Sequence, residues 1–316
     1  MQRSSTTAGL VVAFIAAASF GLSGAFIKPL LEAGWSPAAA VTVRALMGGI
    51  VLAPIAALAL RGKWDALWRG RWRVLGMASI GVAGTQVVYF ASLQRIPVST
   101  AILIEYMAPL LLVAVVWLRS RKTPQVVVLV GSVVAVAGLL FVVSPSGGVA
   151  LDPLGLFFAL LAMVGCAAYY VIAARPSDGL PPVALAAAGL LLGGVILALV
   201  GVAGLLPFTA TFGNVDMLGN PAPWWVPMLI VGVIATALSY ATGIAATEML
   251  GSRLASFVGL LEVVTAAIYA WLLLGEALTI TQAIGGVLIL AGIAFVRSER
   301  VDELVVEEFL PDKVDA

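Results

Sequence analysis

Three ionisable residues lie inside long apolar runs of this 316-residue chain: Arg44, Glu105 and Glu262. An unpaired charge in hydrocarbon costs on the order of several kcal/mol, so such a residue indicates a binding, coupling or ion-pairing site by default. The chain has no His and a single Cys, Cys166. Any proton chemistry must therefore use carboxylates, and a metal site built from His and Cys is excluded.

Arg44 and Glu105 lie at matching depth in their apolar runs. They follow Pro37 and Thr100 by seven and five residues, which places both roughly 8–11 Å from the outer boundary at 1.5 Å per residue. They either pair with each other or share a substrate. A structural alternative for Arg44 is a buried ion pair or an outward-snorkelling side chain that sets helix packing.

Glu262 lies eight residues into a run that enters from the inner side, roughly 12 Å deep. It is either a coupling or gating carboxylate that faces the inner half of a cavity, or a neutral carboxylic acid bonded to Thr265 one turn later. For Glu105 a functional role is favoured, because Tyr106 and the helix-loosening Pro109 adjoin it.

Tyrosines and other polar residues at comparable depth complete the predicted site. All six tyrosines lie within apolar runs, where a phenol needs a hydrogen-bond partner or a wet cavity. Adjacent Tyr169 and Tyr170 point about 100° apart on a helix, so at most one is expected to face a given cavity. The predicted substrate-binding or coupling residues are Glu105, Tyr106, Arg44, Glu262, Gln86, Tyr89, Tyr240, Tyr169 and Tyr269.

The elements that position these residues are membrane helices. Hydrophobic residues make up 62% of the chain, charged residues 10%, and the mean hydropathy is +1.12, so we expect an all-α polytopic membrane protein. Runs of about 17 to 25 apolar residues mark such helices. Ten are predicted, at 8–27, 38–60, 74–93, 100–117, 125–143, 154–174, 183–205, 225–246, 254–274 and 282–296. The loop Pro207–Pro223 is predicted to be irregular.

The distribution of positive charge predicts the orientation. With a cytoplasmic N-terminus, 14 of the 17 Lys and Arg residues fall in inner loops, and Lys28 and Arg95 fall outside. By the positive-inside rule, both termini are expected in the cytoplasm. The segment 297–316 is predicted to be an acidic cytoplasmic tail, to which no function is assigned.

The two halves of the chain resemble each other. At an offset of 154, residues 101, 117, 118, 131, 137, 138, 141 and 142 match 255, 271, 272, 285, 291, 292, 295 and 296 without a gap, and at an offset of 145 Gly48 and Gly49 match Gly193 and Gly194. Five spans per copy is an odd number, so we predict two inverted repeats, 8–143 and 154–296, with a site between them. The repeated glycines of the fifth spans are expected to allow close helix packing.

Two matching stretches resemble a known family. SRLASFVGLLEVVTAAIYAWLLLGEALT (Ser252–Thr279) and STAILIEYMAPLLLVAVVWL (Ser99–Leu118) look like EamA-type members of the drug/metabolite transporter superfamily, over roughly residues 8–297. WLLLGE is the most specific mark, and its Gly275-Glu276 reads as a helix cap with an exposed acid.

The resemblance also has a finer part and a departure. YFASLQRIP and IEYMAP are similar to the threonine/homoserine exporter branch. Many relatives have Glu-Pro where this chain has Glu262-Val263, which puts a proline kink of the ninth span in doubt. The resemblance implies a cavity lined by spans 1, 3, 4, 6, 8 and 9.

These features predict a secondary active exporter, not an enzyme. The expected substrate is a small organic metabolite, most plausibly an amino acid or related zwitterion, moved by alternating access with protonation of Glu105 or Glu262 as the candidate coupling step. Export of lipophilic cations or drugs and passive facilitation are the alternatives. We expect a bacterial-type inner membrane location, contact with lipid, substrate and protons, and no cofactor, metal or nucleic acid. The oligomeric state is left open.

Overall fold

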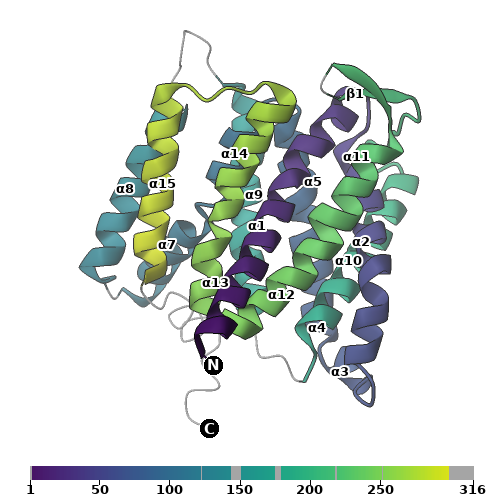
Figure 1. Ribbon diagram of the computed structural model, residues 1–316, viewed down its shortest axis with the longest axis horizontal. Coiled ribbons are helices and arrows are strands. Elements are labelled where there is room, and N and C mark those ends of the chain that lie inside the picture. Colours follow the sequence, from purple (N-terminus) through teal and green to yellow (C-terminus); the bar gives the residue numbers. More distant parts are fainter. Residues whose placement is uncertain are drawn as a thin grey trace.

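The computed structural model describes residues 2–121, 123–143, 151–174, 179–217, 219–250 and 252–298, which form a bundle of long helices (Figure 1). The helices of the first half are α1 (Gln2–Glu32), α2 (Pro37–Ala59), α3 (Asp65–Arg69), α4 (Arg71–Gly76), η1 (Met77–Gly84), α5 (Thr85–Leu93), α6 (Val98–Glu105), α7 (Ala108–Ser120) and α8 (Val126–Val143). The second half has α9 (Pro153–Ala174), α10 (Pro182–Val202), α11 (Trp225–Leu229), η2 (Ile230–Leu238), α12 (Ser239–Leu250), α13 (Ser252–Gly259), α14 (Leu261–Leu274) and α15 (Ile280–Ser298).

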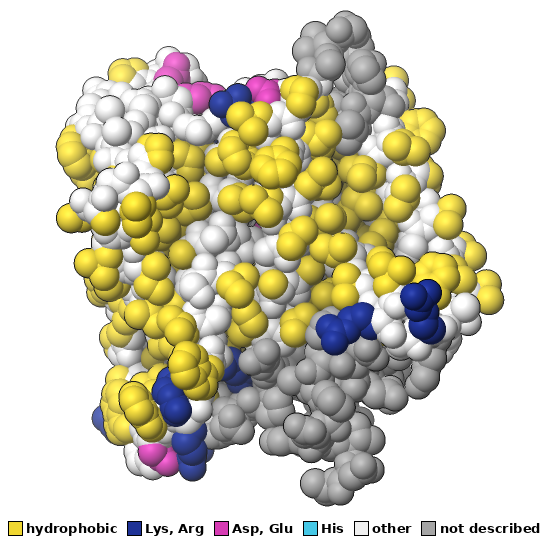
Figure 2. Space-filling model, turned by 180° about the vertical axis from the view of Figure 1, so that it is seen from behind, with side chains coloured by type: hydrophobic (Ala, Val, Ile, Leu, Met, Phe, Trp, Pro, Cys, Tyr) yellow, Lys and Arg dark blue, Asp and Glu magenta, His cyan; other side chains and the backbone are white. Residues whose placement is uncertain are grey.

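The chain is a multi-pass membrane protein. Within the described residues, eight helical segments are long and apolar enough to cross a membrane, and Val126–Val142 and Ile280–Val296 are shorter apolar helices. The ten-span topology therefore stays a prediction, because these shorter helices occupy two of the predicted spans. Figure 2 shows a belt of hydrophobic side chains, with Lys and Arg gathered at one end and most acidic side chains at the other.

The first helix begins and the last helix ends on the same side of the bundle. In Figure 1, α1 starts and α15 finishes at the lower end, which agrees with an even number of crossings but does not say which end is cytoplasmic. The predicted acidic tail lies outside the described residues.

Two helix pairs of the bundle make reciprocal contacts through glycines. A Cβ added at Gly131 would lie 2.7 Å from the carbonyl oxygen of Gly292, and one at Gly138 would lie 2.6 Å from that of Gly285. The expected close packing is thus confirmed, and it joins α8 to α15. The two helices run antiparallel. Gly131 contacts the repeat partner of Gly138, and Gly138 contacts the repeat partner of Gly131, at the offset of 154 residues. This reciprocal pattern is what an inverted repeat requires, so it supports that prediction.

The second glycine pair joins α2 to α10 in the same reciprocal way. A Cβ at Gly49 would lie 2.7 Å from Leu191, and one at Gly194 would lie 2.7 Å from Leu46. Leu46 and Gly49 precede Leu191 and Gly194 by 145 residues, the offset of the predicted repeat in this part of the chain. Self-complementary contacts of this kind are typical of a twofold relation.

The third span of each half contains a widened, π-helical segment, η1 and η2. Thr85 donates its hydroxyl to the Ile80 carbonyl, and Ser239 donates its own to that of Ile234, both at 2.8 Å and both five residues back. Such bulges are frequent at functional sites. Both segments precede helices that carry predicted site residues.

The segments predicted as the fourth and ninth spans are both interrupted. Pro109 lacks the N–H that would bond the Glu105 carbonyl, so α6 ends at Glu105 and α7 starts at Ala108. In the ninth span α13 ends at Gly259 and α14 starts at Leu261. This span breaks without the proline that the resemblance called for, and its break lies 154 residues after the first.

We predicted an irregular connection over residues 207–223. The structure corrects this, because part of the connection is a β-hairpin. Strands β1 (Asn214–Met217) and β2 (Asn220–Pro223) form an antiparallel hairpin with Asn214 opposite Pro223. The residues just before the hairpin pack on the link between α1 and α2: Trp35 donates its indole N–H to the Thr211 carbonyl at 2.7 Å and is 1% exposed. Pattern reading missed the hairpin because its strands have four residues each and alternate poorly.

Candidate functional site

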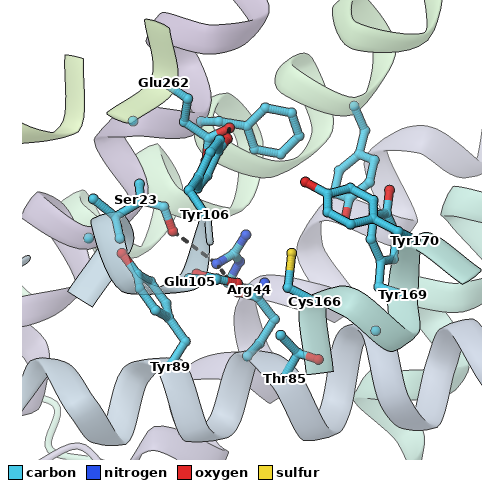
Figure 3. A pocket seen from close by; sticks show the side chains of 17 residues that line it. Ser23, Arg44, Thr85, Tyr89, Glu105, Tyr106, Cys166, Tyr169, Tyr170 and Glu262 are labelled. Carbon is cyan, nitrogen blue, oxygen red and sulfur yellow. Dashed lines mark hydrogen bonds between the residues drawn. The ribbon is translucent and has the colours of Figure 1, made fainter. Parts of the chain in front are cut away.

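A cavity of about 250 Å³ lies between the two halves of the bundle. Its walls come from α1, α2, η1, α5, α6, α9, α12 and α14, which are the spans that the resemblance implied together with α2. The lining residues are Phe20, Gly21, Ser23, Gly24, Arg44, Gly81, Thr85, Gln86, Tyr89, Ile102, Glu105, Tyr106, Cys166, Tyr169, Tyr170, Tyr240 and Glu262 (Figure 3).

The structure brings eight of the nine predicted site residues to this cavity and leaves one out. Tyr269 is not among the lining residues; it lies about two turns beyond Glu262 on α14. Tyr169 and Tyr170 both line the cavity, so the expectation that only one would do so is wrong. Their rings lie 5.5 Å apart, and α9 presents a face broad enough for both.

Sequence reasoning missed several lining residues that carry no charge. Ser23 and Phe20 lie in an apolar run rich in small residues, and Thr85 and Cys166 are equally inconspicuous. Thr85 could have been found from the repeat, because it corresponds at the offset of 154 to Ser239, which adjoins the predicted site residue Tyr240.

Arg44 is buried in the cavity wall, with 6% of its surface exposed. Nη1 donates to Ser23 Oγ and Gln86 Oε1, both at 2.9 Å, and Nε donates to Thr236 Oγ1 at 3.1 Å. Figure 3 shows the guanidinium beside Glu105 in the middle of the site. Among the described residues, no carboxylate oxygen lies within 4.0 Å of it. Outward snorkelling and a direct Arg44–Glu105 ion pair are therefore both absent from this conformation.

One carboxylate lies at a helix C-terminus and the other at a helix N-terminus. Glu105 is the last residue of α6, and Glu262 lies in the first turn of α14. The partial positive charge of a helix N-terminus stabilises an anion, whereas the C-terminus disfavours one. The helix dipoles therefore act in opposite senses on the two carboxylates, which gives them different electrostatic surroundings.

Hydrogen bonds separate the two carboxylates further. Tyr106 donates its hydroxyl to Glu262 Oε2, whereas the Glu105 carboxylate has no hydrogen-bond or ion-pair partner in the described part of the chain. Of the two alternatives for Glu262, the one with a bond from Thr265 to its carboxylate is not present: Thr265 Oγ1 donates to the main-chain oxygens of Glu262 at 3.0 Å and Ala17 at 3.3 Å.

A comparison with protein families decides the class of this molecule. The EamA-like transporter family matches residues 7–144 and 153–298. The chain belongs to the EamA-like transporter family. Its two matches divide the chain near the middle, and the family consists of membrane transporters.

Relatives and a solved structure agree with this assignment. The chain is similar to "Uncharacterized inner membrane transporter YicL" of Salmonella typhimurium (22% identity, 92% of this chain, 96% of the relative) and to an "Uncharacterized transporter" of Archaeoglobus fulgidus (26% identity, 70% and 74%). One crystal structure of a protein shares its fold, with a TM-score of 0.61, 20% identity, and coverage of 92% of this chain and 96% of that one. None of these names gives a substrate, so the threonine/homoserine branch rests on motifs alone.

Proposed function

We propose that this transporter is a secondary active exporter of amino acids or related zwitterions, in keeping with its motif similarity to the threonine/homoserine exporter branch. The observation that supports this most is the cavity's charge arrangement: a buried arginine held by neutral partners and two carboxylates on the same cavity. The carboxylate of a zwitterion can bind the arginine, and its ammonium group can bind a carboxylate of the cavity.

Arg44 suits the substrate carboxylate. Its bonds to Ser23, Gln86 and Thr236 fix the guanidinium through Nε and Nη1, and Nη2 has no hydrogen-bond partner among the described residues. A planar guanidinium held in this way can accept a carboxylate in a charge-assisted bond. No carboxylate of the described residues forms an ion pair with the guanidinium, which leaves it available to an anionic group in the cavity.

Glu105 suits the substrate ammonium or, in its place, a proton. The two cannot occupy the carboxylate together, so protonation from the outside would release the substrate and deprotonation in the cytoplasm would permit binding. This competition is the simplest form of exchange coupling. The other charged and titratable groups on this cavity are Arg44, Tyr89, Tyr106, Cys166, Tyr169, Tyr170, Tyr240 and Glu262.

Alternating access would move the two halves about this site. The broken spans end in the cavity, as discontinuous helices do at transporter sites, and the glycine-mediated pairs α8–α15 and α2–α10 join the halves. The charge asymmetry of the loops supports cytoplasmic termini, and the named inner membrane location of the Salmonella relative supports the same location here.

Export of lipophilic cations is the second candidate. It is favoured by the tyrosine faces and carboxylates of the cavity, which could bind a cation without any anionic group. Competition in proteoliposomes would separate the two. Neutral amino acids should inhibit transport of a labelled amino acid while quaternary ammonium compounds should not; the reverse order would favour cation export.

A further inference from the structure

Glu276, the acid of the WLLLGE motif, is not the exposed residue we expected. Its side chain is 12% exposed and makes an ion pair with Lys28, which is 17% exposed. Its second oxygen, Oε2, accepts the backbone N–H of Val98 at 2.8 Å. Three elements meet at this carboxylate: the upper part of α1, the first residue of α6, and the turn between α14 and α15.

We propose that Lys28, Glu276 and the Val98 N–H form a latch that closes the predicted outer end of the cavity and opens during transport. This latch rests on the proposed function, since it assumes that the cavity opens to both sides in turn. Gly24 lines the cavity one turn before Lys28. A Cβ at Gly24 would collide with the side chain of Val98, which is fully buried, so the latch lies directly next to the cavity wall.

The chemistry of the latch suits a contact that breaks and reforms. A hydrophobic seal would expose apolar surface on opening, whereas Lys28 and Glu276 can each be hydrated when they separate. The Val98 N–H lies in the first turn of α6, where it has no partner within the helix, so it can bond water when it leaves Glu276. The ion pair therefore stabilises the closed state, and hydration of its separated groups keeps the free-energy cost of opening low.

Helix α14 connects the latch to the cavity. Gly275, with φ +68°, ends the helix, and the N–H of Glu276 bonds to the Ala270 carbonyl at 3.1 Å. This arrangement fixes Glu276 to the helix end. Glu262 lies in the first turn of the same 14-residue helix, so α14 spans about 21 Å between the Glu262 end of the cavity and Glu276 at 1.5 Å per residue. A change at Glu262 can thus be transmitted to Glu276 by a rigid displacement.

The chain provides its own probe of opening, because Cys166 is its single cysteine and lines the cavity. Its rate of labelling by a membrane-impermeant maleimide can be measured in oriented vesicles from each face. Glu276→Ala and Lys28→Met should each raise the rate from the outer face about tenfold, the effect of losing a hydrogen-bonded charge. Lys28→Arg, which keeps the ion pair, should label like the parent.

Two controls make the result decisive. Arg95→Gln breaks the exposed Arg95–Asp152 pair, whose Nη1 to Oδ2 distance is 3.0 Å, at the same predicted end of the molecule and should leave the labelling rate unchanged. Cys166→Ser reports the background. An unchanged outer rate in folded Glu276→Ala protein, or a rise at the cytoplasmic face instead, would overturn the latch. Labelling needs no substrate, so a wrong substrate class would not affect this test.

Discussion

Arg44 differs from the other polar groups of the cavity in the number of neutral side chains that orient it. Ser23, Gln86 and Thr236 come from α1, α5 and η2 and meet at one guanidinium. These neutral partners orient the guanidinium, and its charge is balanced only at longer range by Glu105 and Glu262 on the same cavity.

Replacing Arg44 should therefore affect anionic groups of the substrate specifically. In Arg44→Gln, the apparent affinity for a zwitterionic amino acid should fall by about tenfold to a hundredfold, because a charge-assisted bond is lost. Arg44→Lys should recover part of the affinity. Binding can be measured by substrate-induced thermal shift, which also reports whether the variant is folded. Unchanged affinity in folded Arg44→Gln protein would contradict the assignment.

The two carboxylates should respond differently to the same substitution. Glu105→Gln should abolish the increase in accumulation that a pH difference produces, because the proton-binding group is gone, and substrate exchange should continue at a lower apparent affinity, because the ammonium group loses its charged partner. In the parent, substrate affinity should fall as pH falls, since a proton on Glu105 displaces the ammonium group. Glu262→Gln serves as the matched control and should keep the pH response. Full pH-driven accumulation in Glu105→Gln would exclude Glu105 as the coupling group.

At the scale of elements, the sequence predicted where helices lie better than where they break. Charge, tyrosines and apolar runs were sufficient to find eight cavity residues, because polar side chains in membrane helices almost always face the bundle interior or a water-filled cavity. The break at Leu260 has no proline signal, and the contacts of Glu276 and Thr265 depend on how α14 lies against α1 and α6. These are tertiary properties that no local pattern contains.

The glycine contact between α8 and α15 gives a prediction for stability. Gly138→Ala would place a methyl group 2.6 Å from a main-chain oxygen of α15 and should cost roughly 1–3 kcal/mol, because backbone must move to admit it. Thermal unfolding in detergent measures the loss. Gly213→Ala is the control, since a Cβ there meets nothing within 4 Å. Equal melting temperatures for the two variants would show that the helices do not pack this closely.

At the scale of the whole molecule, the two halves repeat their irregularities as well as their helices. Each has a π-helical segment in its third span, a break in its fourth, and glycines in its fifth that contact the other half. The carboxylates depart from this repetition: Glu105 precedes its break, and Glu262 follows the other. The symmetric parts suit a scaffold with two equivalent orientations, and the asymmetric carboxylates suit a site with separate roles.

The most direct test of this account is accumulation of a labelled neutral amino acid in proteoliposomes in which the lumen corresponds to the outside. With an acidic lumen, the account predicts uptake above the equilibrium level, and collapse of that excess when a protonophore removes the pH difference. Equilibration to the same level with and without the pH difference would contradict proton-coupled export and indicate a passive facilitator.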